Sequence, residues 1–159
     1  MPTPEEFRAL LEDDFGVSEW SEKQPPLIEA VDHHRLAEVL KERGYTLYVF
    51  VVASHRPGVE GAEDALTAAG YIELATGLRS PTENSQLAIW RVRVGLDEQL
   101  ATLVDLFAGA DWQEREQFDL VGVRFAGHPD PRRLMLPEDW EGHPLRRDYA
   151  INTPHPPWR

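Results

Sequence analysis

The sequence predicts an α+β fold. We expect a two-layer domain with a mixed or antiparallel sheet and helices on one face, followed by an extended, proline-rich C-terminal arm. Alternating apolar runs predict paired strands, and apolar residues three and four apart between capping residues predict helices. Residues 124–159 hold seven of the 13 prolines, which break helices and remove backbone donors. We therefore assign residues 1–125 to the domain and residues 126–159 to the arm.

Start and stop signals predict three helices. The first has Thr3 as N-cap, Pro4 at the first helical position, Glu6 completing a capping box, and a stop at Gly16. Two further helices follow at residues 32–44 and 111–121, with Asp32 and Asp111 as their N-caps and a glycine at or after each end.

Residues 45–53 are rich in β-branched and aromatic side chains, which predicts a strand buried on much of both faces at the centre of the sheet. Residues 71–78 and 87–94 alternate in polarity across a turn-forming segment, so we expect an antiparallel hairpin. The shorter predicted elements are a strand at 27–31, a helical turn at 102–107 and a strand at 123–125, with residues 55–70 left open between helix and loop.

Composition excludes several functional classes. The chain of 159 residues has no cysteine, which removes disulfides, thiol nucleophiles and iron–sulfur clusters held by thiolates. A formal net charge of −12 disfavours nucleic acid as a partner. The longest apolar stretch is far shorter than the roughly 20 residues that cross a bilayer, and the N-terminus lacks the pattern of a secretion signal. We therefore expect no membrane span and a cytoplasmic location.

Glu114, Glu116 and Asp119 form the densest polar cluster, which permits the hypothesis of an acid/base pair or a carboxylate metal site. The alternative is structural. Glu114 lies three residues after Asp111, as in a capping box, and Arg115 is spaced i, i+4 from both Asp111 and Asp119. We favour the structural interpretation, because charge patterns of this kind usually stabilise helices.

The six histidines permit a second, weaker metal hypothesis. None of them lies in an HExxH motif or at the close spacing of a zinc site, although pairing across the fold stays open. The two Gly-His-Pro triplets, at residues 127–129 and 142–144, are more simply turns. The chain also lacks the glycine-rich phosphate loops and the nucleophile-elbow motif.

Residues 114–149 read EREQFDLVGVRFAGHPDPRRLMLPEDWEGHPLRRDY, and this stretch closely resembles the motif of the C-subunit family of respiratory complex I. In that family an ERE helix leads through DL and GHP into RR, PEDW, GHPLR and DY. The preceding phrase LVDLFAGADW is also similar to the family. The motif or interface residues that the resemblance implies are Glu114, Arg115, Glu116, Asp119, Gly122, Gly127, His128, Pro129, Arg132, Arg133, Pro137, Glu138, Asp139, Trp140, Gly142, His143, Pro144, Arg146, Asp148 and Tyr149.

The resemblance implies a cofactor-free structural subunit in the peripheral arm of NADH:quinone oxidoreductase, not catalytic alone. Its partners would be the quinone-pocket subunit and the subunit of the terminal iron–sulfur cluster. FMN, iron–sulfur clusters and quinone would reside in partner subunits, at the cytoplasmic face of the cell membrane. The alternative is the same subunit in a ferredoxin-, coenzyme F₄₂₀- or hydrogenase-linked relative. A free-standing metal-dependent enzyme is a more distant rival.

Overall fold

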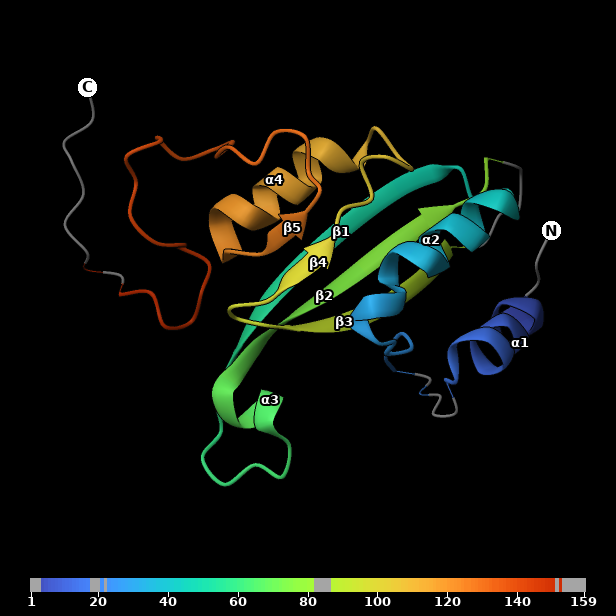
Figure 1. Cartoon of the computed structure of the whole chain (residues 1–159), viewed down its shortest axis with the longest axis horizontal. Helices are drawn as coiled ribbons and strands as arrows, with labels where there is room; N and C mark the ends of the chain where they lie inside the picture. Colours follow the sequence, from blue (N-terminus) through green and yellow to red (C-terminus); the bar gives the residue numbers. More distant parts are fainter. Residues whose placement is uncertain (1–3, 18–20, 22, 82–86, 151, 153–159) are drawn as a thin grey trace.

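The computed structural model of the protein describes residues 4–17, 21, 23–81, 87–150 and 152. Figure 1 shows the helices gathered around a long, strongly twisted sheet, with the C-terminal segment beside α4. The elements in chain order are α1 (Pro4–Phe15), the 3₁₀ helix η1 (Ala30–Asp32), α2 (His33–Glu42), β1 (Leu47–Pro57), α3 (Ala65–Ala69), β2 (Gly70–Arg79), β3 (Leu87–Gly95), β4 (Gln99–Ala101), α4 (Ala110–Val121) and β5 (Arg124–Ala126). No helix in this described part is long and apolar enough to span a bilayer.

The main sheet is antiparallel, with the strand order β1-β2-β3. The α+β class and the predicted hairpin are confirmed, because β2 pairs with β3 in a continuous register that includes Leu74 opposite Val92. The prediction that residues 45–53 form the sheet centre is wrong, since β1 is an edge strand and β2 lies in the middle. The apolar richness of β1 was misleading because Val49 and Val52 are exposed, whereas Val51 is buried.

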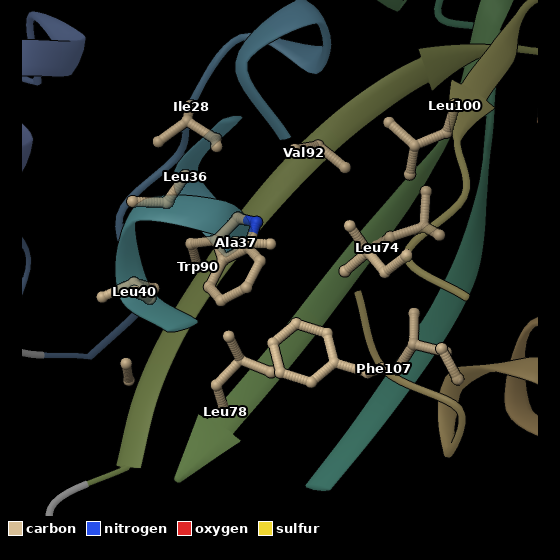
Figure 2. Packing of buried hydrophobic residues seen from close by; sticks show 14 of the residues in the cluster. Ile28, Leu36, Ala37, Leu40, Leu74, Leu78, Trp90, Val92, Leu100 and Phe107 are labelled. Carbon is tan, nitrogen blue, oxygen red and sulfur yellow. The ribbon is translucent and has the colours of Figure 1, made fainter. Parts of the chain in front are cut away.

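The core lies between α2 and one face of the sheet. Figure 2 shows Leu36 and Leu40 of α2 close to Trp90 of β3 and Leu78 of β2. All four side chains are fully buried. Because a strand alternates between its two faces, the same periodicity places Leu74 in this core and its neighbours on the opposite face.

Both edges of this sheet are occupied. On the β1 side, the N–H groups of Val51 and Ala53 donate to the side-chain oxygens of Gln113 (3.0 Å) and Gln117 (2.9 Å) on α4. On the β3 side, Arg91 N–H donates to Pro26 O (2.8 Å), and Ile28 N–H donates to Arg91 O (2.9 Å). Unpaired edges invite pairing with other chains, so these contacts protect the sheet.

The predicted strand at residues 123–125 is confirmed as β5, which pairs in parallel with β4. The pattern analysis missed β4, because three residues carry too little periodicity. The turn predicted at residues 102–107 is present, with Phe107 N–H donating to Leu103 O at 2.7 Å. In the open segment 55–70, β1 continues to Pro57, and α3 begins after Asp64, whose carboxylate accepts from Thr67 N–H at 2.7 Å.

Three local predictions need correction or qualification. Residues 27–31 form no strand, because only Leu27 bridges Arg91 and the chain then turns into η1, leaving Val31 86% exposed. Asp111 is not the N-cap of α4, since the helix starts one residue earlier and Gly109 is the N-cap. Asp32 occupies the N-cap position of α2, but its side chain makes no capping hydrogen bond. Helix α1 matches the predicted first helix, while Thr3 lies outside the described residues.

Candidate interface site around Asp119

Asp119 is buried near the C-terminal end of α4. Its Oδ2 accepts from three consecutive backbone N–H groups, those of Leu134 (3.1 Å), Met135 (2.7 Å) and Leu136 (2.8 Å). Its Oδ1 accepts from Arg133 Nη1 at 2.6 Å. Burial raises the pKa of Asp119, but these hydrogen bonds outweigh it and hold that pKa below its ordinary value. Residues 134–136 thus satisfy their backbone donors through one carboxylate, without a helix or a sheet.

The Arg133 guanidinium joins α4 to two later points of the chain. Nη1 also donates to Asp119 O at 3.2 Å, and Nη2 donates to the carbonyls of Trp140 and Gly142, both at 3.0 Å. Arginine offers five donors in a rigid planar fork, whereas lysine offers a single point charge. Arg133 therefore closes residues 133–142 into a loop that is anchored on Asp119.

Arg115 holds the segment that precedes this loop. Nε donates to Arg132 O (3.1 Å), Nη2 donates to Arg133 O (3.1 Å), and Nη1 lies 3.3 Å from Asp130 Oδ2. The predicted i, i+4 ion pairs of Arg115 within the helix are therefore wrong. Arg115 reaches across to the C-terminal segment, because backbone carbonyls there need donors and the segment has no helix to supply them.

His143 returns the segment to the end of α4. Its Nδ1 lies 2.9 Å from Asp119 O, which can only accept, so Nδ1 carries the proton. Leu145 N–H then donates to Leu120 O at 2.9 Å. The imidazole lies against Gly122, where an added Cβ would fall 2.7 Å from His143 Cδ2 and where φ is +87°. Glycine at this position both ends the helix and makes room for the ring.

The far end of the segment contacts β1. Arg147 N–H donates to His55 Nδ1 at 3.2 Å, and Asp148 Oδ1 lies 3.7 Å from the same nitrogen. Because Nδ1 accepts, His55 is neutral with its proton on Nε2. Burial, Arg146 and Arg147 lower the pKa of His55, and Asp148 offsets part of that effect. Sequence reasoning missed His55, since nothing local marks a strand residue that meets a segment 92 positions away.

Glu114 is buried on another side of α4, and the predicted capping box is wrong. Its Oε2 accepts from the Thr102 hydroxyl at 2.5 Å, and its Oε1 accepts from Leu103 N–H at 2.8 Å. Burial raises the pKa of Glu114 to about 7, although the two hydrogen bonds act in the opposite direction. Thr102 was a second residue that the sequence did not single out.

The first Gly-His-Pro triplet, residues 127–129, forms a turn that contacts α4 through a hydrogen bond. His128 Nε2 lies 3.3 Å from Asp111 O, and Asp130 N–H donates to His128 Nδ1 at 3.1 Å. These two contacts assign the proton to Nε2. Gly127 has φ +83°, which suits a glycine turn.

The remaining predicted site residues lie along the same segment. Arg132 pairs with Asp130 at 2.7 Å and Arg146 pairs with Asp148 at 2.7 Å. Glu116 accepts weakly from Gln117 Nε2 at 3.5 Å. The Tyr149 ring lies against Gly142, where an added Cβ would fall 2.8 Å from Cε2. The other members are mostly exposed positions on the segment: Pro129, Pro137, Glu138, Asp139, and the half-buried Pro144.

The carboxylates of α4 do not converge on a common point. Asp119 faces the C-terminal segment, whereas Glu114 faces the 102–103 turn. Among the residues that the structure describes, no group of three or more histidine, aspartate or glutamate side chains could hold a metal ion. Part of the predicted set, chiefly Arg115, Asp119, Arg133 and His143, instead forms an anchoring network that holds an irregular segment against α4.

Comparisons with known proteins agree with the motif. The family model described as "Respiratory-chain NADH dehydrogenase, 30 Kd subunit" matches residues 27–155. A relative from Synechococcus sp. (strain WH7803), named NAD(P)H-quinone oxidoreductase subunit J, is 48% identical over 78 residues, which cover 49% of this chain and 42% of the relative. One of the same name from Prochlorococcus marinus (strain NATL1A) is 57% identical over 64 residues, covering 38% and 37%. The matches thus span less than half the length of these curated relatives.

A solved structure shares the fold. The chain described as "Nqo5 of the trypsin-resistant fragment (1-134) in P63 form" superimposes with a TM-score of 0.53 and 24% identity, over 66% of this chain and 80% of that one.

The fold and the anchoring network define an α+β domain whose irregular C-terminal segment is held against α4 and β1 by side-chain contacts. The chain belongs to the respiratory-chain NADH dehydrogenase 30 kDa subunit family, which is the C- or J-subunit family of complex I. The curated relatives reported above are named as subunits of an NAD(P)H-quinone oxidoreductase.

Proposed function

We propose that this chain is a cofactor-free structural subunit of the peripheral arm of NADH:quinone oxidoreductase. In this proposal it positions the quinone-pocket subunit and the subunit of the terminal iron–sulfur cluster, while FMN, iron–sulfur clusters and quinone reside in partners. The complex would lie at the cytoplasmic face of the cell membrane. Family membership supports the complex, and the absence of cysteine supports a role without thiolate-held clusters.

The observation that carries the proposal is the anchoring of residues 130–148, by Asp119 and Arg133 in the middle and by Arg115 and His55 at the two ends. A segment that is pinned at both ends presents its remaining side chains in a fixed order. Met135 and Leu145 are each 62% exposed, so they lie outside the network and are available to a partner. Exposed apolar side chains on a rigid segment are typical of interface anchors. We propose residues 126–159 as the docking arm and Met135 and Leu145 as two of its contacts.

Substituting the two exposed side chains tests this role. Met135→Asp with Leu145→Asp should leave the free chain folded, because neither side chain is buried. The same variant, expressed in place of the native chain, should reduce the NADH:quinone oxidoreductase activity of isolated membranes and release the chain from the complex. Val31→Asp with Val59→Asp is the matched control, since both of these side chains are exposed in the domain. Unchanged assembly of the first variant would refute the docking arm.

The cofactor-free part of the proposal has a separate readout. The purified chain should show no absorbance in the visible range and no metal at stoichiometric level by elemental analysis. Stoichiometric flavin, iron or zinc would contradict it.

A further inference from the structure

The face of the sheet that points away from α2 carries exposed apolar side chains and a group of arginines. Because alternate strand residues point to opposite faces, the buried Ile72, Leu74 and Trp90 place their neighbours on this outer face. Six residues on this face matter for binding: Val52 and Arg56 of β1, Glu73 of β2, and Leu87, Arg91 and Arg93 of β3. We call this set the outer sheet face.

The centre and one end of the outer sheet face are apolar and accessible. Val52 is 57% exposed, and Leu87 is 42% exposed. The ring of Phe50 in β1 lies against Gly77 of β2. A Cβ added to Gly77 would fall 2.5 Å from Phe50 Cε1. By register, the Phe50–Gly77 pair lies between Val52 and Leu87, and exposed apolar side chains that share one sheet face indicate an interaction site.

The other end is positively charged. Glu73 lies 3.3 Å from Arg56 Nη2, 3.3 Å from Arg91 Nη1 and 3.4 Å from Arg93 Nε. Burial raises the pKa of Glu73, but the arginines lower it more, so the carboxylate stays ionised and neutralises one of three charges, while Asp64 offsets part of the charge of Arg93. The side chains of Arg56 and Arg93 are 42% and 36% exposed. A local positive excess therefore stands out on a chain whose formal net charge is −12.

The mode of docking is restricted by the sheet edges. Gln113 and Gln117 accept from two backbone donors of β1, and the Pro26–Ile28 segment pairs with Arg91 of β3. A partner strand cannot pair at these positions, which favours contact through the face. Guanidinium groups with a fixed orientation favour bidentate contact with carboxylates.

We propose that the outer sheet face docks a partner protein that is apolar opposite Val52 and Leu87 and carries carboxylates opposite Arg56 and Arg93. This inference rests on the proposed function, since it supplies a second contact with the complex. A symmetric dimer through the same face would bury two positively charged groups in one interface. An anionic lipid surface is bound by clusters of about four to eight basic residues, whereas this end has three arginines that share one glutamate.

Crosslinking in the intact complex tests the surface and its occupant. Position 52 or 93 is replaced by the photoreactive residue p-benzoylphenylalanine, the complex is purified from membranes and irradiated, and the crosslinked peptides are identified by mass spectrometry. Position 35, on the exposed side of α2 in the opposite layer, is the control. We expect positions 52 and 93 to crosslink to one partner subunit, at a segment with aspartate or glutamate nearby, and position 35 to give at least fivefold less product.

Other products overturn the proposal: crosslinks to lipid, crosslinks to a second copy of this chain, crosslinks to a segment without acidic residues, or no product from either position. Failure of the proposed function gives a different result, because the unmodified chain would then not co-purify with oxidoreductase subunits at all.

A charge substitution gives a second readout. Arg56→Gln with Arg93→Gln should weaken retention of the chain in the complex at least tenfold at low salt, and less at high salt, because exposed charges are screened. Arg35→Gln with Arg43→Gln is the matched control on α2, and it should behave as the unmodified chain does. The melting temperature of each free variant is measured beside it. Equal retention of both variants, with both folded, would contradict the proposal.

Discussion

Trp90 Nε1 donates a hydrogen bond of 3.1 Å to His33 Nδ1, and both rings are buried between α2 and the sheet. The acceptor role of Nδ1 requires a neutral imidazole with its proton on Nε2. Burial, with a smaller contribution from His34, lowers the pKa of His33 to about 3. The core therefore contains a group that must stay uncharged.

Acid should destabilise the domain through His33. Between pH 6.5 and about 3, the unfolded chain binds a proton that the folded chain does not, so stability falls as pH falls. At pH 5 the loss from this group would be about 2 kcal/mol. Urea unfolding at pH 8, 6.5 and 5 measures it, with His33→Gln for comparison. The difference between the two proteins should shrink in acid, and a parallel pH dependence would refute the assignment.

The ionisation of Glu114 should change the stability with pH in the opposite direction to that of His33. With the pKa of Glu114 raised to about 7, the folded chain holds a proton that the unfolded chain loses above pH 4.5, so this group's contribution to stability falls between pH 4.5 and 7. Glutamine matches the protonated form, because it can accept from Leu103 N–H and donate to the Thr102 hydroxyl. Glu114→Gln should therefore be more stable than the native chain at pH 8, by about 3 kcal/mol, with the gap closing at pH 4.5.

Urea unfolding at the two pH values measures this gap. Glu116→Gln, two residues along the same helix and only partly buried, is the control for removing one carboxylate from α4. If Glu116→Gln changed stability with the same pH dependence, the effect would belong to net charge and not to the buried site.

The sequence predicted the elements that depend on local signals, and failed where partners are distant. Helices α1, α2 and α4 carry their own periodicity, and the alternating polarity of residues 71–78 and 87–94 was enough to predict that β2 and β3 pair. The position of β1 at the sheet edge depends on α4, whose glutamines replace a neighbouring strand. Periodicity within residues 45–53 contains no information about that contact.

In the candidate site, too, residues that belong to a local motif were predicted and contacts between distant residues were not. The family motif identified Asp119, Arg133 and His143 as a group, but helical spacing assigned the wrong partners to Arg115. Its true partners are an aspartate and two backbone carbonyls, and carbonyls leave no trace in a sequence. His55 is missing from the motif because it lies on a strand and meets the segment only in the folded chain.

We expect the Asp119–Arg133 ion pair to contribute most of the free energy that holds the C-terminal segment against α4. Asp119→Asn removes the negative charge from a buried site that faces an arginine and three N–H groups, so we expect a loss of about 2–4 kcal/mol in unfolding free energy. Arg133→Met should cost a similar amount, and the double variant less than the sum, with a coupling of about 1–3 kcal/mol. Hydrogen exchange should show faster exchange at Leu134, Met135 and Leu136 in Asp119→Asn, with β2 unchanged. Additive effects would mean that the pair does not act as a unit.

At Gly122, a residue with a Cβ is disfavoured both by the backbone conformation and by the nearby ring of His143. The φ of +87° at Gly122 disfavours any residue with a Cβ, and that Cβ would also fall 2.7 Å from the His143 ring. Gly44 separates the two causes, because its φ is +94° and an added Cβ would meet nothing within 4 Å. Gly44→Ala should therefore cost about 1 kcal/mol, and Gly122→Ala distinctly more. Adding His143→Ala to Gly122→Ala should recover the excess, as measured by urea unfolding. If Gly122→Ala and Gly44→Ala cost the same, the ring of His143 does not press on the end of α4.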